Sequence, residues 1–98
     1  HEIPIYGGLQ EINDNKSSFD TNLGDVFVMK YNLREGIEVN KIKEFYDKSL
    51  LEFGWKVDKS IKKNNNLSYK RQNDILEINI DKDISGKILV KFLILYIN

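Results

Sequence analysis

The C-terminal segment, residues 87–97, constrains the fold more than any other part of the chain because, read as a strand, it is apolar on both faces. Side chains of a strand alternate between two faces. One face receives Ile88, Val90, Phe92, Ile94 and Tyr96, and the other receives Leu89, Leu93, Leu95 and Ile97, with Lys91 as the only charge. Such a strand is central in a sheet and covered on both sides, or it presents an apolar surface to a partner.

Two covers for the second face are available, because one helix covers only one side of a sheet. The first is the N-terminal segment, with the apolar residues Ile3, Ile5, Tyr6, Leu9 and Ile12. We favour it, since large exposed apolar patches are uncommon on soluble monomers. The second is another copy of the protein, and the interface of that homodimer is then formed by Leu89, Leu93, Leu95 and Ile97.

The helix that covers the first face is predicted over residues 37–53. Apolar side chains recur there at steps of three and four, which places them on one stripe of a helix: Val39, Ile42, Phe45, Tyr46, Leu50 and Phe53. Gly54 follows the stripe, at the position where a left-handed C-cap favours glycine. Trp55 then restarts the chain in an extended direction.

The remaining strands follow from alternation of apolar and polar residues. Alternating segments occur over residues 25–33, 55–61, 67–71, 76–81 and 87–97. Residues 1–24 contain Pro4, three glycines and a polar stretch at 13–18, so we expect an extended segment and a loop there. The prediction is a single α+β domain over residues 1–98. One helix packs on a mainly antiparallel four-stranded sheet in the order β-α-β-β-β over residues 25–98, preceded by the N-terminal extended segment of residues 1–24.

The predicted core combines the helix stripe with one face of each strand. It consists of Phe27, Met29, Tyr31, Ile42, Phe45, Tyr46, Leu50, Trp55, Val57, Leu76, Ile78, Ile80, Val90, Phe92 and Ile94.

Two motifs resemble a known group of proteins. Residues 3–8, Ile-Pro-Ile-Tyr-Gly-Gly, resemble the P-x-Y-P-G opening of small bacterial cell-envelope domains, often lipoproteins, although Gly7 replaces a proline. Residues 42–55 are similar to the V-x-x-F-Y-x-x-x-L-x-x-x-G-W helix of these domains. The resemblance covers most of the chain and implies an extracytoplasmic module, in the periplasm or at the cell surface, with no assigned activity.

Residues for the common catalytic and cofactor sites are missing. The chain has no Cys and a single His at position 1, which excludes a thiol nucleophile, a zinc–thiolate site and a Ser-His-Asp triad. Neither standard glycine-rich phosphate loop occurs. Fifteen basic and fifteen acidic residues leave no net charge, so nothing general attracts nucleic acid. We predict no enzyme activity, no catalytic residue, no cofactor and no nucleic-acid partner.

Two groups of carboxylates also give no site. Residues 81–86 begin like a calcium-binding EF-hand loop, but Phe92 stands at position twelve, where a bidentate Glu is required. Asp14, Asp20 and Asp25 crowd one polar stretch without a signal of burial, which acid–base catalysis needs. We therefore predict no metal site. No apolar run approaches the ~20 residues of a membrane span, so no transmembrane segment is predicted in this chain.

Positive charge gathers between residues 55 and 73, where only Asp58 is acidic. The basic residues are Lys56, Lys59, Lys62, Lys63, Lys70 and Arg71. They indicate either a surface for an anion or an acidic partner, or lysines that protect an edge strand from pairing with another chain. The second interpretation is favoured.

Three functions remain open. The leading hypothesis is a non-catalytic binding or assembly module of the bacterial cell envelope, with an unknown protein or envelope component as partner. The alternative is an intracellular homodimeric accessory domain that associates through the last strand. The third is a small enzyme or nucleic-acid binder that works through the hairpin of residues 56–71.

Overall fold

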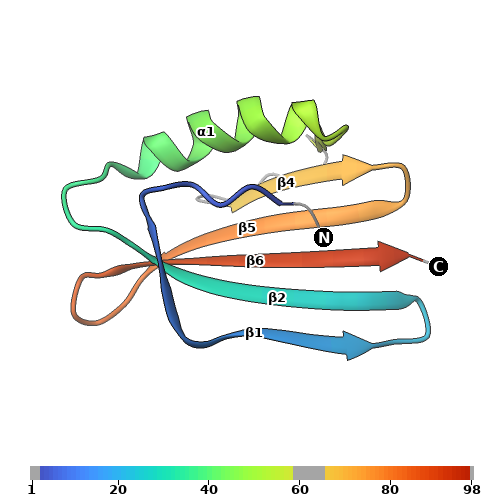
Figure 1. The fold of residues 1–98 in the computed structure, drawn as a ribbon, viewed down its shortest axis with the longest axis horizontal. Coiled ribbons are helices and arrows are strands. Elements are labelled where there is room, and N and C mark those ends of the chain that lie inside the picture. Colours follow the sequence, from blue (N-terminus) through green and yellow to red (C-terminus); the bar gives the residue numbers. More distant parts are fainter. Residues whose placement is uncertain (1–2, 59–65, 98) are drawn as a thin grey trace.

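The computed structural model describes residues 3–58 and 66–97, which form one six-stranded antiparallel sheet and one helix (Figure 1). The elements are β1 (Leu9–Asp20), β2 (Gly24–Leu33), α1 (Val39–Glu52), β3 (Lys56–Val57), β4 (Asn66–Arg71), β5 (Asp74–Lys82) and β6 (Ile88–Ile97). In space the strands follow the order β1-β2-β6-β5-β4-β3. The doubly apolar strand β6 lies inside the sheet, between β2 and β5.

The predicted fold class was wrong, because the protein is mostly β and its order is β-β-α-β-β-β-β. The additional strand at the start is β1, in the region predicted to be an extended segment and a loop. Its polar stretch lies at an irregularity between Glu11 and Lys16, where Asp14 has a φ of 54°. An edge strand can be this polar because the sheet does not bury both of its faces, so the alternation that identifies inner strands is absent.

The strand predicted over residues 55–61 is described only in part. In the described chain it is reduced to β3, and residues 59–65 lie outside the described residues. Val57, predicted to be in the core, is 52% exposed because β3 is the last strand of the sheet, beyond β4.

The core lies between α1 and one face of the sheet. The helix buries Ile42, Tyr46 and Leu50 completely, as its stripe predicted. Antiparallel register places the buried side chains of the strands on the same face, with Phe92 between Met29 and Ile78. The helix ends where Gly54, at a φ of +87°, lets the N–H of Trp55 return to the Leu50 carbonyl at 3.0 Å.

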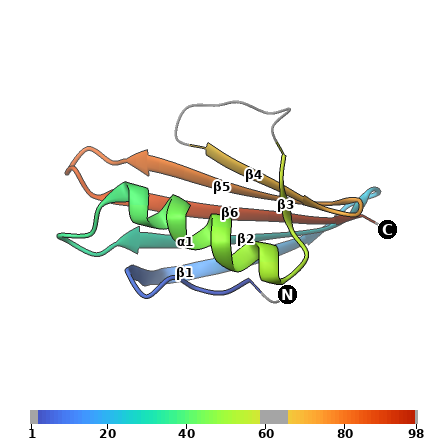
Figure 2. The same cartoon turned by 90° about the horizontal axis from the view of Figure 1, so that it is seen from above.

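The N-terminal segment packs on the same side of the sheet as the helix, so the predicted cover of the second face was wrong. Ile3 and Leu9 are buried in the core. The Tyr46 hydroxyl donates a hydrogen bond to the Pro4 carbonyl at 2.8 Å and accepts one from the Tyr6 N–H at 3.1 Å. Figure 2 shows this segment beside α1, towards β1. No helix or strand within residues 3–58 and 66–97 packs on the opposite face of the sheet, which we call the open face.

Candidate functional site

The open face carries a group of neighbouring apolar side chains. Register places Phe19, Val26, Leu95 and Ile75 in one row across β1, β2, β6 and β5, and Val28 and Leu93 in the next row. Ile97 extends the group at the end of β6. We call these seven residues the apolar patch. Phe19 is 55% exposed, Ile97 is 37% exposed, and the others are half-buried.

Three of the four predicted interface residues belong to this patch. Leu93, Leu95 and Ile97 are members, whereas Leu89 lies on the same face beyond a row that contains Lys30 and Lys91. Leu89 therefore lies in the polar half of the open face, between Asn32 and Asp81.

Sequence reasoning missed the patch residues contributed by the other strands. Phe19 fell in the region predicted to be a loop, and Ile75 stood before the start of its predicted strand. Val26 and Val28 could have been found, because they alternate with the core residues of the same strand. Their significance depends on β6 lying next to β2, and pairing between distant strands is not encoded in the local pattern.

The cations near the patch occupy two places. Lys30 and Lys91 are cross-strand neighbours at its inner end. Lys56 and Lys70 are cross-strand neighbours at its side, where β3 and β4 form the edge of the described sheet. Glu77 lies next to Leu93 on β5 and is the one acidic residue beside the patch in the described β5 strand.

The predicted basic surface is divided by the structure. Lys56 and Lys70 belong to the open face, and Lys59, Lys62 and Lys63 lie outside the described residues. Arg71 lies on the other side: its guanidinium carbon is 4.4 Å from the centre of the Trp55 ring, and Nη1 donates to the Phe53 carbonyl at 3.1 Å. Arg71 thus binds the carbonyl end of α1, which is a structural role.

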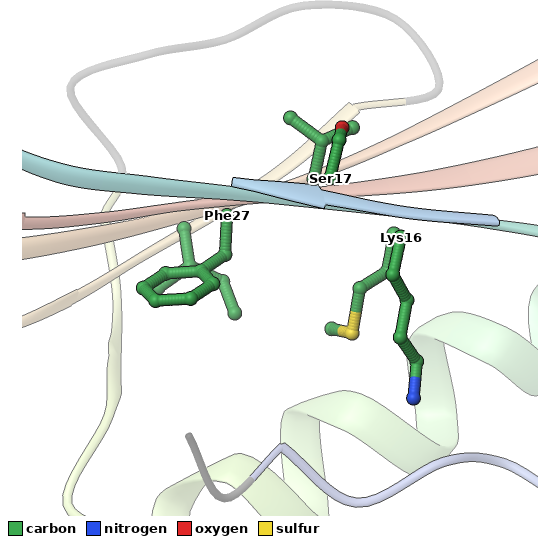
Figure 3. A pocket seen from close by; sticks show the side chains of 6 residues that line it. Lys16, Ser17 and Phe27 are labelled. Atoms are coloured by element: carbon green, nitrogen blue, oxygen red, sulfur yellow. The ribbon is translucent and has the colours of Figure 1, made fainter. Parts of the chain in front are cut away.

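A pocket of about 190 Å³ opens on the helix side of β1, β2 and β6 (Figure 3). Phe27, Met29 and Ile94 supply apolar walls, and Lys16 projects from β1 on the same side. Pockets for drug-sized ligands usually have about 300–1,000 Å³. This small volume, with Lys16 as the one titratable side chain in its lining, suits a small apolar group better than a drug-sized ligand.

The structure also shows where the two groups of carboxylates considered in the sequence analysis lie. Asp20 and Asp25 face each other across the β1–β2 hairpin, and a hydrogen bond with the Asp20 carboxyl, then desolvation, then repulsion raise the pKa of Asp25. In the β5–β6 turn, Asp83 accepts hydrogen bonds from the Ser85 hydroxyl and the Lys87 N–H, which lower its pKa. Both groups are exposed. No cluster of three or more potential metal ligands occurs among the residues that the structure describes.

No helix in the described ranges is long and apolar enough to span a membrane. Comparisons of the chain with protein-family models, with curated proteins and with solved structures found no match. Nothing in them supports the terms cell envelope and lipoprotein-like, so we do not assign the chain to that class. Its resemblance to those domains and its location stay predictions.

Proposed function

We propose that this chain is a non-catalytic assembly module that associates through the open face of its sheet, and that the occupant of this face is a second copy. The observation that carries the proposal is the apolar patch on a face without cover in the described structure. Two sheets packed face to face bury such side chains in a layer ~10 Å thick.

The size of the face is suited to a stable dimer. Four strands of ~30 Å and the shorter β4 of ~20 Å, all ~4.8 Å apart, span roughly 700 Å² before the relief of the side chains is counted. A standard interface buries ~800 Å² of accessible surface on each partner. Burial of apolar surface contributes ~25 cal/mol per Å² before the costs of association.

The charges favour a partner that is apolar at the patch and of mixed charge around it. Lys30 and Lys91 lie beyond the last apolar row, so they stay at the rim when two patches are stacked. The chain as a whole has no net charge, so long-range repulsion does not oppose association of two copies. Glu77, beside Leu93, is available to a cation at the rim of the second copy.

Sedimentation velocity over a concentration series from about 1 µM to 1 mM tests the proposal. Leu93→Lys places a charge in the last apolar row of the patch, opposite Glu77, and we expect it to raise the dissociation constant at least about tenfold, since burying an ion pair in an apolar layer costs desolvation energy. Asn79→Lys is the matched control, because it adds the same charge to the polar half of the same face. If neither variant weakens the dimer of the wild-type chain, a second copy does not occupy the open face. A wild-type chain that sediments as one copy at every concentration would overturn the proposal as well.

A further inference from the structure

The outer edge of β1 is a second surface suited to self-association. β1 is at one end of the strand order, and no strand in the described chain pairs with its outer side. Its first half is interrupted by the irregularity between Glu11 and Lys16, which keeps that half from regular pairing. Residues 16–20, in contrast, pair with β2 in continuous register. An unpaired edge of this kind is a template for another strand.

The β1–β2 hairpin determines which backbone groups face outward. Thr21 and Gly24 form a hydrogen-bonded pair, with N–H to O distances of 2.8 and 3.3 Å. Hydrogen-bonded and non-hydrogen-bonded pairs alternate along antiparallel strands. The pairs that β2 makes with Asp20, Ser18 and Lys16 are therefore of the non-hydrogen-bonded kind. The N–H and C=O groups of these three residues point away from β2, out of the sheet.

The side chains of the same three residues share the helix side of the sheet, and Figure 3 shows Lys16 projecting there. Lys16 and Asp20 are four residues apart, about 13 Å along a strand, so they cannot neutralise each other within one chain. Neither forms a salt bridge within residues 3–58 and 66–97. In an antiparallel pair centred on Ser18, however, Lys16 of each copy lies directly opposite Asp20 of the other.

We propose that two copies of the chain pair edge to edge, antiparallel, through residues 16–20 of β1, with the two-fold axis at Ser18. The three outward-facing residues form about six backbone hydrogen bonds across this contact. Two Lys–Asp pairs, one on each side of the axis, determine the register, because opposite charges stabilise directly facing cross-strand positions and like charges destabilise them. A parallel arrangement places Lys16 opposite Lys16.

The other edge of the described sheet lacks this complementarity. There Lys56 lies opposite Lys70, and β3 is only two residues long, which is how proteins usually protect an edge. At the β1 edge, pairing also covers Phe19, because an antiparallel register centred on Ser18 places it opposite Ser17 of the second copy, next to Val28 of that copy. The two apolar patches then lie on one continuous open face.

A charge-exchange cycle tests the edge contact, with sedimentation velocity as the measurement. Leu93→Lys serves as the background, so that association through the open face does not contribute. In that background, Lys16→Asp and Asp20→Lys each replace two attractive pairs by two repulsive ones, and each raises the dissociation constant at least about tenfold. The double exchange Lys16→Asp/Asp20→Lys restores the pairs in reverse and returns the constant to within about threefold.

Ser18→Pro and Ser18→Ala form a second, independent pair of variants. Proline removes an N–H that faces solvent in the single copy, a position that edge strands tolerate, but it blocks the hydrogen bonds on the two-fold axis. We expect Ser18→Pro to abolish pairing and Ser18→Ala to leave it unchanged, with circular dichroism confirming that both variants keep the fold.

The outcomes separate this proposal from association through the open face. A Leu93→Lys chain that still dimerises, and loses the dimer with Lys16→Asp, supports the edge contact whatever the patch does. A Leu93→Lys chain that sediments as one copy up to about 1 mM, or a double exchange no better than the single ones, overturns it. Dimerisation that is lost with Leu93→Lys alone leaves the open face as the only interface.

Discussion

Replacement of Tyr46 by Phe tests whether the N-terminal segment is held by one hydroxyl group. The Tyr46 hydroxyl donates to the Pro4 carbonyl and accepts from the Tyr6 N–H, so it joins the middle of α1 to a segment 40 residues away in the sequence. The substitution leaves the ring in place, in edge-to-face contact with Phe92 at 5.3 Å and with Phe45 at 4.9 Å. Only the two hydrogen bonds are removed.

The expected loss follows from those two bonds. Each is partly buried and contributes about 0.5–1.5 kcal/mol net, so the free energy of unfolding should fall by about 1–3 kcal/mol. Ile3 and Leu9 still bury their side chains in the core, so the segment should loosen between them without detaching. We therefore expect a lower urea midpoint with an unchanged m-value, because the surface exposed on unfolding stays the same.

The assay is urea denaturation followed by circular dichroism, together with hydrogen exchange at the Tyr6 amide. The Tyr6 N–H loses its acceptor, so its exchange should accelerate while amides in β6 stay protected. Tyr31→Phe is the control, since the Tyr31 hydroxyl has only a 3.9 Å contact to the Met29 sulfur and should cost less than about 0.5 kcal/mol. A Tyr46→Phe chain as stable as this control, with a protected Tyr6 amide, would refute the reasoning.

Three further predictions concern the core and its margins. Burial raises the pKa of Tyr46 and of Tyr69, whose hydroxyl also donates to Asp47 at 2.8 Å. The unfolded chain therefore loses tyrosine protons above pH ~10 that the folded chain keeps, so the free energy of unfolding should decline from there upward, less steeply in Tyr69→Phe. Urea titrations between pH 8 and 11 measure this, and equal slopes would contradict it. Arg71→Ala removes the contact with Trp55 and the bond to the Phe53 carbonyl and should cost about 1–2 kcal/mol in the same assay, whereas equal stability would show that the contact contributes nothing. Gly24→Ala places a Cβ against the Tyr96 carbonyl at a φ of +154° and should lower the free energy of unfolding by about 3 kcal/mol or more in thermal unfolding. The control Gly7→Ala meets open space and should change it by less than about 0.5 kcal/mol. A similar effect at both sites would argue against the close approach of β2 and β6.

The sequence predicted those elements whose pattern is imposed by burial. The helix stripe is unambiguous because α1 buries one side only, and Ile42, Tyr46 and Leu50 recur with its period. Strand β6 was recognised by its two apolar faces, but these left open whether both faces are covered. Strand β1 could not be recognised, because as an edge strand it exposes Lys16, Ser17 and Ser18 and contains residues typical of turns.

The candidate site was predictable only in part for a related reason. Leu93, Leu95 and Ile97 were visible as the second apolar face of one strand, but their neighbours on β1, β2 and β5 depend on the order of strands in space. The direction of the N-terminal segment was likewise hidden, since its apolar residues fit either face of the sheet. The hydrogen bonds of the Tyr46 hydroxyl with Pro4 and Tyr6 hold the segment on the helix side.

The contact between Arg71 and Trp55 gives the protein a natural optical reporter. Trp55 is the single tryptophan of the chain, its ring is almost completely buried, and its indole Nε1 has no hydrogen-bond partner within the described residues. It lies where the helix ends and the sheet resumes, under a guanidinium group. Its fluorescence emission should therefore be short in wavelength in the native protein and shift to longer wavelength when this junction opens. The docking of helix on sheet can thus be followed in the unlabelled chain, at one known position.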